Sequence, residues 1–171
     1  MKINYPKFCF LILMILYGII CAVHPNDFHF LDRVNLIAHE AGHLLFSWFG
    51  EFIMVIGGTI GQLFVPAAFS IYFYLRRDFF SSSVTCFWTG QNFINISVYV
   101  KDAQAMNLPL VSIGGGDPIH DWNYILSKLS LLKFDQIIGS MVYSLGLIIM
   151  VAALVWGFFN SQKEELKLSH E

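Results

Sequence analysis

The chain has 171 residues, of which 56% are hydrophobic and only 13% are charged. Its mean hydropathy of +0.61 is too high for a water-soluble domain of this length, which needs a polar surface around its core. The net charge of −2 gives no basic excess, so nucleic acid is excluded as a partner. We therefore predict an integral membrane protein that has membrane lipid around it.

The first apolar segment covers residues 8–23 and follows Lys2 and Lys7. This layout is typical of a signal peptide or of an uncleaved anchor helix. No A-x-A cleavage site follows, because Ile20 and Ala22 are a poor pair of small residues. We therefore expect an anchor helix.

A second helix is expected over residues 32–49, where Gly50 can end it. After a loop that ends in Gly-Gly-Gly-Asp-Pro, Asp117 can cap a short helix and Pro118 can occupy its first turn. The segments that are long enough to span a membrane are residues 52–75, 79–100 and 136–159, and a polar tail follows at 160–171.

The predicted fold class is all-α: a polytopic membrane helical bundle that forms a single integral membrane domain over residues 1–171. It has four transmembrane helices plus short interfacial helices, or five transmembrane helices if residues 32–49 also cross. The four-span arrangement fits the positive-inside rule better, because it puts six of the ten Lys and Arg residues on the cytoplasmic side rather than five. It predicts a bacterial inner-membrane protein with both termini in the cytoplasm.

The sequence His39-Glu40-Ala41-Gly42-His43 is an H-E-x-x-H motif inside this second helix. Residues four apart lie on one face of a helix, so both imidazoles can bind one zinc ion. Glu40 then lies at the flank of the metal. There it can accept a proton from water whose pKa zinc lowers toward roughly 7, and return it to a leaving amine. The motif therefore predicts a zinc site with Glu40 as general base.

Zinc needs a third protein ligand, for which the sequence offers more than one candidate. Asp102 ends a polar face of the 79–100 segment, and this face is expected to look into the protein. His120 starts the short helix, whose positive end favours the neutral, metal-binding imidazole. Asp121 can bind the metal or support a ligand. Asp32 or Asn35, on the same face as the motif histidines, can orient one of them.

The chain resembles the site-2 protease-like intramembrane zinc metalloproteases, whose H-E-x-x-H motif is matched by His39, Glu40 and His43. Their second motif is of the form N-x-x-P-x-x-x-L-D-G. Asn95 and Asp102 stand roughly where its asparagine and aspartate would, without the proline and the glycine. The chain is also similar to small uncharacterised bacterial membrane proteins that combine HEAGH with a later HDWNY segment, here at 120–124.

The resemblance implies a peptidase that uses one zinc ion and cleaves a peptide or membrane-protein substrate at or within the bilayer. Asn92 or Asn95 can then hold the substrate or the developing oxyanion. Two alternatives stay open: a hydrolase that acts on lipids or small amides, and a metal-binding membrane subunit without catalytic activity.

Overall fold

The structure is a computed structural model that describes residues 4–109 and 120–162. The regular elements in these two ranges are all helices, which confirms the all-α fold class. The expected cap at Asp117, the expected first turn at Pro118 and most of the polar tail lie outside the described residues. The α-helices are α1 (Tyr5–Val23), α2 (Phe30–Phe46), α3 (Glu51–Leu75), α4 (Phe79–Lys101), α5 (Asp121–Lys128) and α6 (Asp135–Asn160), with short 3-10 turns η1 (Ser47–Phe49) and η2 (Leu132–Phe134).

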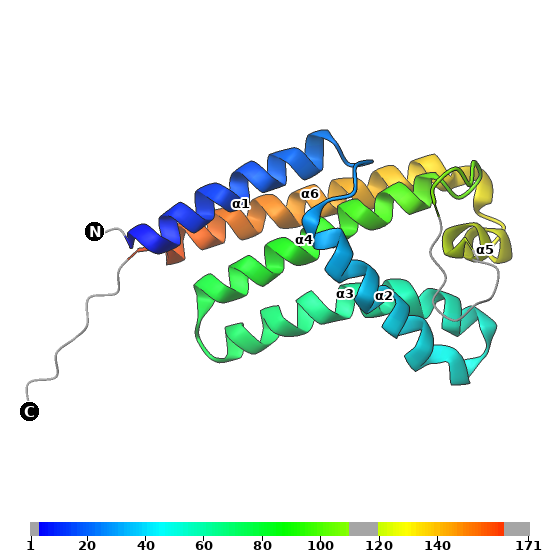
Figure 1. The fold of residues 1–171 in the computed structure, drawn as a ribbon, viewed down its shortest axis with the longest axis horizontal. Helices are drawn as coiled ribbons and strands as arrows, with labels where there is room; N and C mark the ends of the chain where they lie inside the picture. Colours follow the sequence, from blue (N-terminus) through cyan, green and yellow to red (C-terminus); the bar gives the residue numbers. More distant parts are fainter. Residues whose placement is uncertain (1–3, 110–119, 163–171) are drawn as a thin grey trace, which may run out of the picture.

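Helices α1, α3, α4 and α6 run along the long axis of the molecule, whereas α2 crosses obliquely beside α3 (Figure 1). Helix α5 lies at the end of the bundle where α4 ends and α6 begins (Figure 1). The start of α1 and the end of α6 meet at the opposite end, where the backbone N–H of Asn4 donates to the carbonyl of Ser161 over 3.2 Å. The chain therefore begins and ends its described part at one end of the bundle.

Within residues 4–109 and 120–162, three helical stretches are long and apolar enough to cross a membrane: α1, α3 and residues 132–160, which include α6. They support the prediction of a membrane protein. Helix α4 has 23 residues but is less apolar, because it carries Ser, Thr, Gln and Asn side chains. Many of these face the interior: Ser83, Gln91, Asn92 and Ser97 are all buried. Of the face that was predicted to look into the protein, Asn92 is fully buried, whereas Asn95 and Asp102 are partly buried.

Helices α2 and α3 pack with their backbones almost in contact. A Cβ atom at Gly61 would lie 2.6 Å from the carbonyl oxygen of Ala38, and one at Gly57 would lie 3.0 Å from that of Gly42. A side chain at Gly42 would in turn strike the carbonyl of Gly57. Side chains at these positions would force the helices apart, so the glycines bring α3 directly against the HEAGH stretch.

The start of α2 is held against α4 by a buried polar network. The Asp32 carboxylate accepts hydrogen bonds from the Gln91 amide at 2.7 Å and from the backbone N–H of His29 at 2.7 Å. Asn35 donates to the Gln91 side chain at 2.9 Å and accepts from the Trp88 indole N–H at 2.7 Å. Because Asp32, Asn35 and Gln91 are each at most 3% exposed, these bonds fix the position of α2.

Candidate metal site

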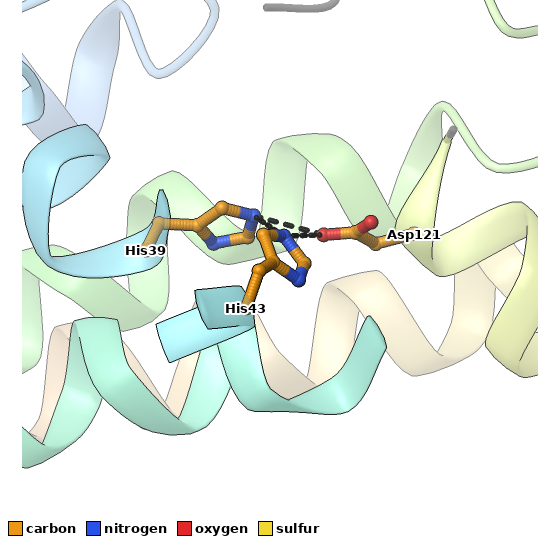
Figure 2. Close-up of side chains that lie close together, drawn as sticks. All are labelled: His39, His43 and Asp121. Carbon is orange, nitrogen blue, oxygen red and sulfur yellow. Dashed lines mark hydrogen bonds and ion pairs between the residues drawn. The ribbon is translucent and has the colours of Figure 1, made fainter. Parts of the chain in front are cut away.

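Three side chains from α2 and α5 converge on one point (Figure 2). The Nε2 atoms of His39 and His43 lie 2.8 Å and 3.1 Å from Oδ2 of Asp121, and 3.1 Å from each other. Tetrahedral zinc with bonds of about 2.0–2.1 Å needs ligand atoms about 3.3 Å apart. The three atoms therefore lie slightly closer together than they would around a zinc ion, and small side-chain rotations would open the site.

The other ring nitrogen of each histidine has its own oxygen partner. The Nδ1 atom of His43 lies 2.9 Å from the backbone carbonyl of Met54, which can only accept a hydrogen bond. The Nδ1 atom of His39 lies 3.1 Å from Oε1 of Gln62, whose amide nitrogen donates to Asn95 over 2.8 Å. Both Nδ1 atoms can therefore donate a hydrogen bond to these oxygens, which leaves Nε2 of each ring facing Asp121, the orientation that metal-binding histidines have.

Gly58 provides the space for the two imidazoles. A Cβ atom at this position would lie 2.5 Å from Nε2 of His43 and 2.7 Å from Nε2 of His39. Any larger residue on α3 would therefore occupy the volume in front of the atoms that could bind a metal. The donor types, the contacts of both Nδ1 atoms and this space could together hold a metal ion.

The electrostatics of the site keep Asp121 ionised. Burial raises the pKa of the Asp121 carboxyl, but the hydrogen bonds from His39 and His43 lower it by more, and the net result lies below its ordinary value. The same hydrogen bond to Asp121 raises the pKa of His43 against the opposing effect of burial. A hydrogen on Nε2 of His43 can therefore bridge to Asp121 at the place where a metal ion would bind.

Glu40 lies beside this group without being part of it. Its side chain is partly exposed and has no hydrogen-bond or ion-pair partner among the residues that the structure describes. Its negative charge contributes to the raised pKa of His43, so it lies within electrostatic reach of the imidazoles. A carboxylate in this position is free to accept a proton near the metal ligands.

The structure does not bring the expected third ligands, His120 and Asp102, to the two histidines. Nε2 of His120 instead donates to the Asp102 carboxylate at 3.2 Å, and its Nδ1 accepts the backbone N–H of Asn123 at 3.2 Å. Both nitrogens of His120 are thus occupied, and the neighbouring Asp121 supplies the third candidate ligand atom, a carboxylate oxygen. The sequence included Asp121 as a possible ligand or support, but it did not single it out.

Four other residues that were predicted near the site make hydrogen bonds with residues of α3 and α4 and not with the candidate ligands. Asp32 and Asn35 were expected to orient a motif histidine, but they bond to Gln91 and Trp88 on α4 instead. Asn92 is fully buried and donates to the Trp88 carbonyl at 3.1 Å, whereas Asn95 holds Gln62. These contacts give each of the four residues a structural partner, although the buried Oδ1 atom of Asn92 has none among the described residues.

Sequence reasoning missed Gln62, Met54 and Gly58. Gln62 left a usable signal, because a single amide in the apolar 52–75 segment needs a buried polar partner. Met54 acts through its backbone carbonyl, which no side-chain pattern reveals.

No protein-family model matches this chain, and comparisons with curated proteins and with solved structures likewise found no match.

Proposed function

We propose that the protein is a membrane-embedded, zinc-dependent hydrolase that cleaves peptide bonds at or within the bilayer. The observation that carries this proposal is the convergence of His39, His43 and Asp121 beside the carboxylate of Glu40, which has no partner among the described residues. Three protein ligands and one open position are characteristic of catalytic rather than structural zinc sites. The helices that are long and apolar enough to span a membrane support a membrane location for the site.

Each residue has a defined part in the proposed reaction. His39, His43 and Asp121 would hold the ion, while Gln62 and the Met54 carbonyl keep both imidazoles in the tautomer that binds it. Zinc, when bound, supplies a Lewis acid that polarises the substrate carbonyl and lowers the pKa of water toward roughly 7. Glu40 accepts the proton of the attacking water and delivers it to the leaving amine.

We further propose that α1, α3, α4 and α6 cross the bacterial inner membrane, with both termini in the cytoplasm. The length of α4 and the burial of its polar side chains support a fourth crossing despite its lower hydropathy. Labelling of a single cysteine placed at Arg76 or Arg77 tests this arrangement. We expect the cysteine to react only with reagents that enter the cytoplasm, and labelling from outside would overturn the proposal.

The catalytic proposal is tested with Glu40→Gln, which removes the base but leaves the three metal ligands unchanged. The purified protein is incubated in liposomes with transmembrane peptides and, separately, with lipid extracts. We expect Glu40→Gln to keep its zinc and to cleave peptides at least about a hundredfold more slowly than the wild type. Glu51→Gln is the matched control, because it makes the same change at an exposed glutamate at the start of α3.

Three other outcomes would contradict the proposal in different ways. Cleavage of lipids without cleavage of peptides would favour a lipid hydrolase. Equal peptide cleavage by Glu40→Gln and wild type would exclude Glu40 as the base. If Glu40→Gln also preserved cellular function while His39→Ala abolished it, the protein would be a metal-binding subunit without catalytic activity.

A further inference from the structure

We infer that His120 and Asp102, which we call the His120–Asp102 clasp, position Asp121 for metal binding without touching the metal themselves. This inference rests on the metal site of the proposed function, but it does not depend on the hydrolytic reaction. The clasp joins the end of α4 to the start of α5, directly beside the residue that supplies the oxygen ligand.

The clasp is anchored on both sides by backbone groups. On the α5 side, Nδ1 of His120 accepts the N–H of Asn123 at 3.2 Å and thereby caps the helix. On the α4 side, the Asp102 carboxylate accepts the backbone N–H groups of Asn107 at 3.0 Å and Leu108 at 2.9 Å. Because Asp102 is also the last residue that closes α4, its oxygens have a fixed position.

The tautomer of His120 follows from these contacts. Since Nδ1 accepts a hydrogen bond from a backbone N–H, the ring hydrogen lies on Nε2 and is donated to Asp102. The His120 side chain is only 3% exposed, so neither nitrogen is open to another ligand. The residue is therefore a connector between two helices and not a zinc ligand.

Helix α5 needs such a connector because it is short. It has eight residues, and a helix of this length has little stability of its own. Its buried apolar residues, Ile125 and Leu126, lie about a full turn beyond Asp121, and in the first half the partly buried Trp122 packs against the same apolar cluster at the end of α4. In the described part of the chain, the polar contacts that bind the first half to α4 are those of the clasp and the hydrogen bond from the Asn123 amide to the Ala103 carbonyl, at 2.7 Å.

The position of Asp121 depends directly on this attachment. Asp121 is the first residue of α5 and follows His120 immediately, so a displacement of His120 moves the carboxylate away from His39 and His43. Groups that orient metal ligands from behind typically change metal affinity by about 10–100-fold when they are removed. Loss of the clasp should accordingly weaken metal binding while the ligand set stays the same.

The test measures zinc affinity by chelator competition and records the absorption spectrum of the Co²⁺-loaded protein. The variants are Asp102→Ala, His120→Ala and the double variant, with Asp121→Ala as the ligand control. His120→Asn is added because asparagine can cap α5 but is too short to reach Asp102. A cooperative unfolding transition of each metal-free variant shows that it is folded.

We expect Asp102→Ala, His120→Ala and His120→Asn each to lower zinc affinity by roughly 10–100-fold, with one metal per chain and the wild-type Co²⁺ spectrum at saturation. The double variant should lose no more than the larger single effect, because both residues act through one contact. In contrast, Asp121→Ala should change the spectrum or abolish binding.

Two results would overturn the inference while leaving the metal site in place. An altered Co²⁺ spectrum in His120→Asn would make His120 a ligand, and unchanged zinc affinity in the folded clasp variants would remove its positioning role. A wild-type protein that binds neither metal would overturn the clasp and the proposed function together. Loss of cleavage in Glu40→Gln is separate, because that variant tests the reaction and not the position of Asp121.

Discussion

Nε2 of His39 lies 2.8 Å from Oδ2 of Asp121, although 82 residues separate the two in the sequence. His39 comes from the oblique helix α2 and Asp121 from the start of the short helix α5, so the contact depends on how both helices dock. The glycines of α3 bring it close to α2, and the His120–Asp102 clasp attaches α5 to α4. The proposed metal site is therefore a product of helix packing and not of the H-E-x-x-H motif alone.

We expect Gly58→Ala to fold but to lose metal binding. The new methyl group would lie 2.5 Å from Nε2 of His43 and 2.7 Å from Nε2 of His39, so both imidazoles must rotate away from Asp121. Elemental analysis of the purified variant measures the metal content. Gly18→Ala is the matched control, because its methyl group would first meet the flexible end of Met150 at 2.9 Å, away from the site. Full metal content in Gly58→Ala would show that the ion does not bind between these imidazoles.

We expect Gln62→Leu to lower zinc affinity by roughly 10–100-fold, because it removes the oxygen that holds the Nδ1 hydrogen of His39. Gln62→Glu should retain most of the affinity, since a carboxylate accepts the same hydrogen bond. Isothermal titration of the metal-free proteins with zinc compares the two variants. Equal losses in both would indicate that Gln62 acts through packing and not through the histidine tautomer.

Zinc affinity should increase with pH around neutrality. The hydrogen bond to Asp121 raises the pKa of His43 above its ordinary value, so a proton competes with zinc for this imidazole until the pH exceeds the raised pKa. Displacement of one proton corresponds to roughly a tenfold gain in affinity per pH unit. Chelator competition between about pH 5.5 and 8.5 measures this dependence. An affinity that stays constant over the range would argue against His43 as a ligand.

The metal-free protein should show the opposite dependence of stability on pH. Because the folded pKa of His43 is raised, its pairing with Asp121 stabilises the fold fully below the unfolded pKa of histidine and is lost as the pH rises through the folded pKa. The lowered pKa of Asp121 keeps this partner ionised in that range. Thermal unfolding of the wild type and of His43→Gln at several pH values separates this contribution, which should vanish in the variant.

We expect Asp32→Ala to lower the free energy of unfolding in detergent by about 1–3 kcal/mol. The substitution leaves the buried Gln91 amide without the acceptor that now lies 2.7 Å away. Asp27→Ala, in the exposed loop before α2, is the control and should have little effect. If both variants were equally stable, the Asp32 network would not fix the start of α2.

The helices could be predicted from the sequence, because apolar length and glycine, proline and charge signals are local properties. The two motif histidines share a face of α2 for the same reason, since helical spacing alone puts them there. The third ligand could not be chosen in this way. Asp102 and His120 are side chains that can bind zinc as well as Asp121 can, and only the docking of α5 shows that the first two residues bind each other.

The contacts of the two Nδ1 atoms also could not be predicted from a local sequence pattern. The carbonyl of Met54 is set by backbone geometry, and the role of Gly58 is the absence of a side chain. A structural role for Gln62 could have been predicted, because a lone amide in an apolar span requires a polar partner. Its link to Asn95 still depended on knowing how α3 pairs with α4.

The most direct test of the central claim is the zinc content per chain of the detergent-purified protein, measured by elemental analysis. Wild type is compared with His39→Ala, Asp121→Ala and Glu40→Gln. We expect about one zinc per chain in wild type and in Glu40→Gln, and none in the other two variants. A folded wild-type protein that contains no zinc, even after zinc is added back, would contradict the account and leave His39, His43 and Asp121 as a partly buried hydrogen-bonded group.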